Sequence, residues 1–303
     1  MAMSHKACVI VNPASGRGSG ARALPAIRSA FSAAGVSEIR LTNSKGDEAP
    51  QVRRALDDGF DTIVACGGDG TWGNVANAII AAGAGRQARL ALLATGTGND
   101  FAKTVGAPAR DFSATARLAV DGNDIAVDVG RIENKHFLNV SGFGFDIAVL
   151  EDIERISWLK GDMLYLYSAL RQLFRYGGVE IGIASSRKRR DRRRHLMLIV
   201  ANARTFGGSF RIAPGASITD GQLDAISIYD APPLARMRLF AAATKGTHVM
   251  SREVVVEQAP TFTLQFAEPP AFETDGEYQR ARSALIQIDC LPAALRVVTP
   301  QSS

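Results

Sequence analysis

Short apolar runs alternate with helical patterns over about the first 125 residues of the chain. The apolar runs predict strands at 7–11, 39–42, 62–66 and 90–93, because each is short and is closed by turn residues. The intervening segments carry apolar residues at helical spacing and predict helices at 20–34, up to 58, and from about 71. This alternation predicts an α/β unit with a Rossmann-like, mostly parallel sheet.

The pattern of predicted elements changes after residue 127, where strand-like runs follow one another with turns between them. One helical pattern, at about 157–175, interrupts eight such runs, which are 127–132, 136–140, 179–184, 196–201, 223–229, 254–256, 262–266 and 284–288. Strands without intervening helices predict an antiparallel sandwich or barrel. We therefore expect a nucleotide-binding α/β domain at 1–127 and a β-rich, lipid-binding domain at 128–292. The tail at about 293–303 is expected to pack back on the first domain.

A glycine turn, Gly67-Gly68-Asp69-Gly70-Thr71, joins the third predicted strand to a helix. Glycines allow backbone N–H groups to approach a ligand closely, and a helix N-terminus favours negative charge. Asp69 would repel a phosphate unless a cation lay between them, so a metal-bound nucleotide is the expected ligand. Taken alone, the stretch is equally compatible with a glycine turn that carries a surface aspartate.

Two further loops have a similar composition. Residues 96–100 (Gly-Thr-Gly-Asn-Asp) follow the fourth predicted strand, and residues 12–20 connect the first strand to the first helix. The latter has neither the spacing of a dinucleotide-binding fingerprint nor the Gly-Lys-Ser/Thr of a Walker loop. Loops at the carboxyl ends of parallel strands share one edge of the sheet, so we expect the three loops to line a single phosphate pocket.

Six motifs occur in order between residues 12 and 277. They are Asn-Pro-x-Ser-Gly at 12–16, Gly-Gly-Asp-Gly-Thr at 67–71, Gly-Thr-x-Asn-Asp-Phe-Ala at 96–102, Asn-Val-Ser-Gly-Phe-Gly-Phe-Asp at 139–146, Asp-Gly-Gln-Leu-Asp at 220–224 and Asp-Gly-Glu at 275–277. Together they resemble the diacylglycerol kinase catalytic-domain family, and especially its soluble bacterial lipid kinases, within the NAD kinase superfamily. The sequence departs from the usual family pattern at Asn74, where relatives commonly have glutamate, and at Ala94, where they commonly have proline.

The resemblance implies ATP as phosphoryl donor and Mg²⁺ as metal. The residues that it implies for nucleotide binding are Asn12, Ser15, Gly16, Thr42, Gly67, Gly68, Asp69, Gly70, Thr71, Asn74 and Thr97. Within the family's pattern, Asp69 holds the nucleotide's Mg²⁺, with Asp100 and Asp146 as supporting carboxylates, and Asp69 and Asp146 count as catalytic.

Two motifs in the second half carry further roles by the same resemblance. Glu277 matches the proton acceptor for the lipid hydroxyl. Asp220 matches the side-chain ligand of a separate magnesium site, which carbonyl groups of Ser217 and Gln222 complete. Simpler interpretations remain: Asp220-Gly221 and Asp275-Gly276 both suit two-residue hairpin turns, and Asp100 suits the N-cap of a helix that begins at Phe101.

The charge of the chain is concentrated in one segment. Residues 187–194 carry a net charge of +6, whereas the whole chain carries +5. The run lies between two predicted strands, so we expect an exposed hairpin tip that is either a solvated loop or a contact with anionic membranes. No aromatic stacking motif accompanies it, and nucleic acid is not an expected partner. A homodimer is a further partner that the sequence leaves open.

No apolar run reaches the roughly 20 residues that span a bilayer, and the N-terminus lacks the long apolar core of a secretory signal. The three scattered cysteines suggest buried reduced thiols. The expected protein is cytoplasmic and peripherally membrane-associated, and it transfers the γ-phosphate of ATP to a hydroxyl of a diacylglycerol-like lipid. An NAD kinase-like enzyme and a non-catalytic lipid- or nucleotide-binding regulator remain as alternatives, and the acceptor lipid stays open.

Overall fold

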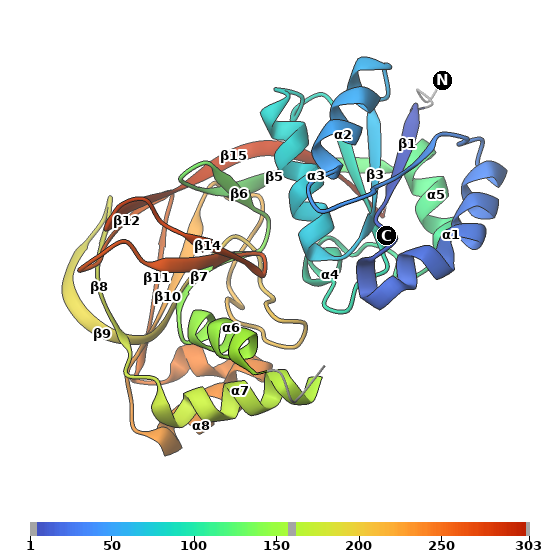
Figure 1. The fold of residues 1–303 in the computed structure, drawn as a ribbon. Coiled ribbons are helices and arrows are strands. Elements are labelled where there is room, and N and C mark those ends of the chain that lie inside the picture. Colours follow the sequence, from blue (N-terminus) through green and yellow to red (C-terminus); the bar gives the residue numbers. More distant parts are fainter. Residues whose placement is uncertain (1–4, 157–161, 301–303) are drawn as a thin grey trace. The chain divides into compact units, whose positions relative to one another are not determined.

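The computed structural model of the chain describes residues 5–156 and 162–300 (Figure 1). The chain divides into two compact units. The first unit comprises Met1–Val129, Ile218–Asp220 and Leu291–Ser303, and the second comprises Gly130–Ser217 and Gly221–Cys290. The chain passes from one unit to the other within two long strands, β5 (Asn123–Ile132) and β15 (Leu285–Thr299), and on either side of the short segment Ile218–Asp220.

A parallel sheet forms the centre of the first unit. Its strands lie in the order β2-β1-β3-β4, with β1 at Ala7–Val11, β2 at Ile39–Leu41, β3 at Thr62–Gly67 and β4 at Arg89–Ala94. The end of β15 extends this sheet, since Arg296 and Val297 pair in parallel with Arg89 and Leu90. The strand order reverses between β1 and β3, which is where open α/β sheets bind ligands.

Helices cover both faces of this sheet. Helix α1 packs on α5 and α2 packs on α3; the helix bounds are Ser15–Ala33 for α1, Glu48–Asp57 for α2, Asp69–Ala81 for α3, Asp100–Val105 for α4 and Phe112–Asp121 for α5. Apolar side chains of α1, such as Ile27 and Phe31, meet Val9 and Val64 of the sheet in a fully buried cluster. The predicted α/β unit with a parallel sheet is thereby confirmed, and each of its four strands lies within a residue or so of the predicted bounds.

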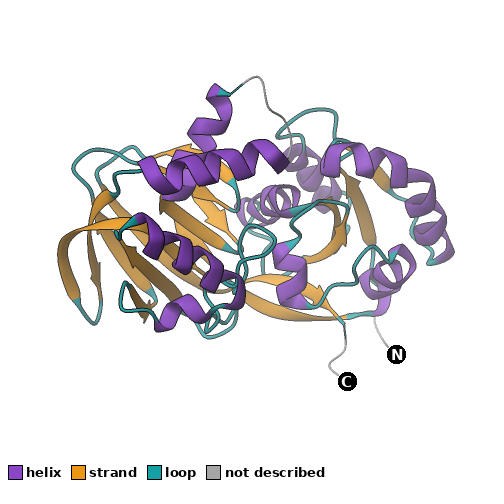
Figure 2. Ribbon diagram, turned by 90° about the horizontal axis from the view of Figure 1, so that it is seen from below, coloured by secondary structure: helices purple, strands orange, loops and turns teal. Residues whose placement is uncertain are grey.

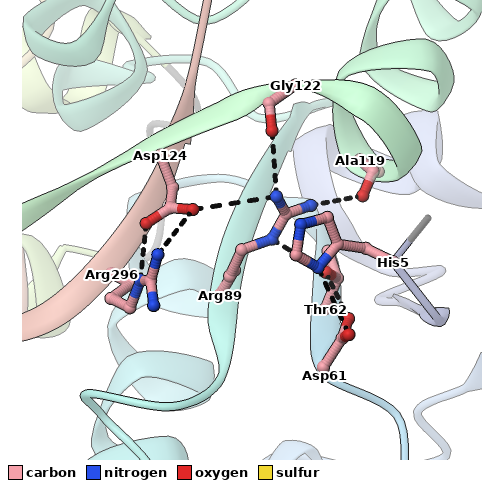
Figure 3. Close-up of polar contacts among 8 residues, drawn as sticks. All are labelled: His5, Asp61, Thr62, Arg89, Ala119, Gly122, Asp124 and Arg296. Carbon is pink, nitrogen blue, oxygen red and sulfur yellow. Dashed lines mark hydrogen bonds and ion pairs between the residues drawn. The ribbon is translucent and has the colours of Figure 1, made fainter. Parts of the chain in front are cut away.

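Arg89 forms a network of hydrogen bonds and ion pairs at the edge of this sheet where its strands begin (Figure 3). Its guanidinium group is almost completely buried and donates to Thr62 Oγ1 at 3.0 Å and to the carbonyl oxygens of Gly122 and Ala119 at 2.9 and 2.6 Å. Asp124 lies 3.7 Å from Arg89 and accepts two hydrogen bonds from Arg296 of β15. This network joins β3, β4, α5, β5 and β15 at the edge opposite to the glycine loops.

The second unit is an antiparallel β structure with helices on one side, which confirms the predicted sandwich (Figure 2). Two of its strands, β10 (Leu223–Tyr229) and β11 (Val254–Ala259), pair with each other, and β10 also pairs with β9. Its other strands are β6 (Lys135–Phe137), β7 (Val140–Gly144), β8 (Val179–Ser185), β9 (Arg189–Ala201), β12 (Thr261–Gln265), β13 (Ala271–Thr274) and β14 (Glu277–Arg280).

The helices of the second unit correct the sequence analysis, which expected one. The structure has α6 (Phe145–Arg155), α7 (Asp162–Arg175), α8 (Pro233–Lys245) and a short 3-10 helix, η1 (Thr247–Met250). The predicted helix at 157–175 corresponds to α7, and its first five residues lie outside the described part of the chain. Residues of α6, α7 and α8 pack in one apolar cluster with Ile199 and Ile226 of the sheet.

Cys8, Cys66 and Cys290 are buried thiols that form no disulfide, as expected, and burial raises the pKa of both Cys8 and Cys66 to about 12. Among the helices in the described ranges, none is both long enough and apolar enough to cross a bilayer.

Candidate functional site

The three glycine-containing loops of the first unit meet at the carboxyl edge of β1, β3 and β4. Asn12 Nδ2 donates to Thr71 Oγ1 at 3.1 Å, and the hydroxyl groups of Ser15 and Thr95 are 2.8 Å apart. The backbone N–H of Thr95 donates to the carbonyl oxygen of Gly67 at 2.8 Å. These contacts place the predicted phosphate-binding loops side by side in one site.

Glycine is required where these loops touch. A Cβ atom on Gly16 would lie 2.0 Å from the carbonyl oxygen of Thr95, and one on Gly96 would lie 2.6 Å from the Cα atom of Gly68. Gly16 also has a positive φ of 55°, which disfavours other residues. The glycines therefore allow loop-to-loop contact, in addition to any approach of a ligand.

Asp69 connects two of the loops. It is the first residue of α3, and its Oδ1 atom accepts from the backbone N–H of Phe101 in α4 at 3.1 Å. The expectation that Asp100 caps a helix beginning at Phe101 is wrong: Asn99 is the N-cap, Asp100 is the first residue of α4, and the carboxylate of Asp100 binds Lys103 at 3.1 Å. Burial, together with the charge of Asp100, raises the pKa of Asp69.

The residues around this edge fit a nucleotide phosphate with its metal ion. Gly68, the N-cap of α3, provides no side-chain cap, so the first N–H groups of this 13-residue helix are available to an anion. Asn99 Oδ1 is buried and has no hydrogen-bond partner within the described ranges. Thr42 follows β2 and donates its N–H to Val11, Thr97 is exposed in the β4–α4 loop, and Asn74 lies in α3.

Glu277 lies in the second unit, at the start of β14 directly after a hairpin turn. Asp275 and Gly276 have positive φ values of 49° and 86°, and Thr274 pairs with Glu277, so the predicted two-residue turn is confirmed. The carboxylate of Asp275 accepts from the backbone N–H groups of residues 138, 139 and 140 at 2.7–3.0 Å. The turn that presents Glu277 is therefore fixed to the strand beside it.

A buried pair of carboxyl groups lies next to this turn, and the sequence analysis identified only one of them. A Cβ atom on Gly142 would lie 2.0 Å from Asp146 Oδ2 and 2.8 Å from Glu273 Oε1, so these two oxygens are less than about 5 Å apart. Glu273 Oε2 accepts from the N–H of Gly276 at 2.5 Å. Glu273 Oε1 and both carboxylate oxygens of Asp146 have no hydrogen-bond partner in the described part of the chain.

The environment of this pair raises the pKa values of both carboxyl groups. Asp146 is 8% exposed and Glu273 1% exposed, and burial raises the pKa of each. The charge of Asp146 raises the pKa of Glu273 further. Glu273 stands four residues before Glu277, in the strand Ala271–Thr274, whose two apolar residues are followed by two polar ones. This pattern gave no sign that the side chain of Glu273 is buried.

Asp146, at the start of α6, also lines an apolar cavity of the second unit. The cavity has a volume of about 50 Å³. Its remaining lining is almost wholly aliphatic and aromatic and comes from α7, α8 and the adjacent strands and loops, for example Leu173, Phe206, Leu239 and Phe240. The charged side chains in this lining are Asp146 and Arg236.

The loop with Ser217, Asp220 and Gln222 is not a hairpin, so that interpretation of Asp220-Gly221 is wrong. The strand that follows, β10, pairs with β9 and β11, and not with the segment before the turn. Ser217 and Gln222 belong to the second unit and Asp220 to the first. Among the described residues no group of three or more His, Cys, Asp or Glu side chains could hold a metal ion. The magnesium site expected here has a different composition, because two of its three ligands would be carbonyl groups.

The basic run at 187–194 is not a hairpin tip as a whole. The turn lies between β8 and β9, and residues from Arg189 onward form the first half of β9, which pairs with β8. Several of these arginines are engaged within the unit: Arg190 pairs with Glu257 at 3.0 Å, and Arg193 lies over the ring of Tyr229. Only Arg187 and Lys188 precede β9, because the strand extends further than its apolar part.

The structure thus brings together the three predicted loops of the first unit, and in the second unit it groups Asp146 with the turn before Glu277. The meeting of Asp69 with Glu277 stays a prediction, as do the roles of the individual residues.

Two models of known families match successive parts of the chain. Residues 6–132 match the model of the diacylglycerol kinase catalytic domain, and residues 139–299 match that of the YegS C-terminal NAD kinase beta sandwich-like domain. Relatives include a diacylglycerol kinase of Mycobacterium tuberculosis, 28% identical over 98% of this chain and 96% of its own. A "Probable lipid kinase YegS-like" of Pseudomonas aeruginosa is 34% identical over 88% of this chain and 85% of its own.

Solved structures show the same fold. A diacylglycerol kinase of Bacillus anthracis matches with a TM-score of 0.74 at 20% identity, over 99% of both chains. An NAD kinase of Archaeoglobus fulgidus in complex with ATP matches with a TM-score of 0.55 at 16% identity, over 97% of this chain and 94% of its own. The matched family models and the full-length relatives show that this chain belongs to the diacylglycerol kinase and YegS-like family of lipid kinases.

Proposed function

We propose that this protein transfers the γ-phosphate of ATP to a hydroxyl group of a diacylglycerol-like lipid. The observation that carries the proposal is the junction of three glycine loops at the switch point of the parallel sheet, with the N-terminus of α3 open to an anion. Membership in a lipid kinase family supports the choice of a lipid acceptor over NAD.

On this proposal the first unit binds the nucleotide. The loop N–H groups bind phosphate oxygens, and Asp69 with Asp100 faces the Mg²⁺ that neutralises them. When bound, that ion supplies electrostatic stabilisation of the charge that develops on the transferred phosphoryl group. The hydrogen bond from Phe101 to Asp69 fixes the carboxylate between two loops and so orients it before the ligand arrives.

Glu277 is proposed as the proton acceptor of the lipid hydroxyl. The anchored turn of Asp275 and Gly276 holds the backbone of Glu277 in place, and general base catalysis typically contributes about 10²–10⁴-fold to a rate. The separate magnesium site at Asp220, with carbonyl groups of Ser217 and Gln222, remains a structural proposal. There the side chain of Gln222 accepts from Arg187 at 3.3 Å.

The apolar cavity of the second unit is proposed to hold part of the acyl chains, with Asp146 at its polar end. The basic segment 187–194 is proposed to attract the protein to anionic membranes at which the lipid is found. Lys188 and Arg189 are its most direct candidates, because both are exposed at the turn. Unchanged sedimentation of a Lys188→Gln/Arg189→Gln variant with anionic vesicles at low salt would argue against this attraction.

The decisive experiment is transfer of radiolabelled γ-phosphate to a panel of lipid alcohols in mixed micelles. We expect wild type to label at least one lipid, with losses of at least a hundredfold in Asp69→Ala and Glu277→Ala. Asp57→Ala, which removes an exposed carboxylate at the end of α2, is the matched control and should label like wild type. Labelling that survives both site substitutions would refute the assigned roles, and labelling of NAD alone would favour the NAD kinase alternative.

A further inference from the structure

Two neighbouring helices of the second unit turn apolar side chains toward solvent. Of the eleven large hydrophobic side chains that are exposed in the described part of the chain, seven lie on α7, α8 and η1. We define the apolar face as six of these residues: Leu170 and Phe174 of α7, Leu234, Met237 and Phe240 of α8, and Met250 of η1.

These helices already bury another apolar stripe. Ala169 and Leu173 of α7 and Leu239 and Ala243 of α8 pack in the core cluster of the second unit. A helix on the surface of a soluble protein ordinarily carries polar residues on its outer side. Here Leu234 is 81% exposed and Met250 is 86% exposed, so a second apolar surface lies opposite the packed one.

The helices pack together, so the exposed residues form one region. Helix α7 contacts α8, and α8 contacts η1. Both views show α7 and α8 running along the same side of the β structure (Figures 1 and 2).

The helices of this face carry more basic than acidic residues, and Arg252, which follows η1, pairs with Glu253. Residues 163–179 and 231–252 contain six lysines and arginines and no aspartate or glutamate. Arg171, Arg236 and Arg238 pair with carboxylates from neighbouring segments, whereas Arg175 and Lys245 are exposed. A surface of apolar and basic residues suits an anionic lipid interface.

The apolar cavity is lined in part by the same helices. Phe240 belongs to the apolar face, is 36% exposed and also lines the cavity, where its ring lies 4.7 Å from the ring of Phe210. Leu173 and Leu239, on the inner sides of α7 and α8, line the cavity as well. One layer of helix therefore separates the apolar face from the apolar interior.

We propose that the apolar face of α7, α8 and η1 inserts into the surface of an anionic bilayer and that the acceptor lipid passes from the bilayer into the cavity beside Phe240. This inference rests on the proposed lipid kinase function. It assigns the main membrane contact to this face, with the basic segment 187–194 as an auxiliary attraction.

The test uses the full chain and two kinds of vesicle, pure phosphatidylcholine and phosphatidylcholine with phosphatidylglycerol. A Leu234→Ser/Met250→Ser variant should lose about tenfold or more in partitioning onto the anionic vesicles, because both side chains would enter the bilayer. Leu285→Ser, 60% exposed on β15 of the same unit, is the matched control and should bind as wild type does. Equal binding of the double variant and wild type overturns the proposal, as does wild type that fails to bind anionic vesicles.

A second measurement separates this inference from the proposed function. Phosphorylation of a short-chain, water-soluble diacylglycerol without vesicles should be the same for wild type and the double variant, because neither residue lines the cavity. Activity on this acceptor together with unaltered vesicle binding of the variant would overturn the membrane face and leave the kinase function standing. Vesicle binding that depends on Leu234 and Met250 without phosphorylation of any lipid would overturn the function alone. A dimer that these substitutions dissociate, with vesicle binding unaffected, would assign the face to a second copy.

Discussion

The buried pair of Asp146 and Glu273 gives the sharpest prediction about the second unit. Two carboxylates less than about 5 Å apart, each almost fully buried, cannot both be charged without a large free-energy cost. The pair therefore retains at least one proton, and Oε2 of Glu273 accepts from the N–H of Gly276. Replacing Glu273 with glutamine mimics a protonated Glu273, since its amide can accept from Gly276 and donate to Asp146.

The sign of the pH dependence follows from the raised pKa of both groups. As the pH rises above about 4, the unfolded chain releases its carboxyl protons, whereas the native pair retains at least one. The stabilisation that this protonated pair contributes is therefore fully present at low pH. It is lost as the pH rises toward the native pKa, which for Asp146 is about 7. One retained proton corresponds to about 1.4 kcal/mol per pH unit.

Glu273→Gln removes that retained proton. Its free energy of unfolding should exceed that of wild type by an amount that grows by about 1.4 kcal/mol per pH unit and reaches about 3 kcal/mol between pH 4.5 and 7. An unpaired amide hydrogen in the variant would add a constant offset without changing this slope. Glu273→Leu, which also loses the bond from Gly276, should lie about 1–3 kcal/mol below Glu273→Gln throughout.

Urea unfolding followed by circular dichroism at pH 4.5, 5.5, 6.5 and 7.5 measures these differences. A difference between wild type and Glu273→Gln that is the same at every pH would refute the retained proton. A stability gain in wild type, but not in Glu273→Gln, on addition of Mg²⁺ would show that a cation neutralises the pair instead.

Three further predictions concern the first unit and the hairpin. Gly96→Ala should raise the KM for ATP by about tenfold or more, because its methyl group would collide with Gly68 at 2.6 Å; Gly215→Ala, where a methyl group meets nothing within 4 Å, should leave kinetics unchanged. Arg89→Met should lower the free energy of unfolding by about 3–5 kcal/mol, measured in urea, because it leaves a buried hydrogen-bond network without its donors. Asp275→Ala should cost about 2–4 kcal/mol and lower kcat more than it raises KM, since three N–H groups lose their acceptor and the hairpin loosens.

The sequence predicted the first unit well because its signals are local. Buried parallel strands such as Ala7–Val11 are continuous apolar runs, and the glycines that follow them mark the turns. The helices of this unit were predicted from apolar residues at helical spacing, and that spacing arises because each helix buries one face. The loop contacts themselves, such as the bond between Asn12 and Thr71 across 59 residues, depend on strand order, which periodicity does not contain.

The second unit was harder to predict for identifiable reasons. Helix α8 carries Leu234 and Met237 on its outer side as well as Leu239 inside, so its sequence lacks the polar face that marks a helix. Helix α6 begins one residue after β7 ends at Gly144, whose φ of 111° makes the turn without any loop residues. Strand β9 begins with arginines that have low strand propensity, and its pairing with β8 overrides that preference.

The Asp-Gly-Glu motif shows why a functional assignment cannot be made from residue type alone. All three residues occupy one turn, yet the carboxylate of Asp275 is fully used by three backbone donors and Gly276 is needed for its positive φ. Only Glu277 has a side chain left for chemistry. Asp69 combines the two tasks, because one of its oxygens accepts from Phe101 and the carboxylate is nevertheless directed to the loops where phosphate is expected. A carboxylate held by fixed backbone donors keeps its position when substrates come and go, so the rigidity of both motifs follows from the same hydrogen bonds that limit which of their residues can act.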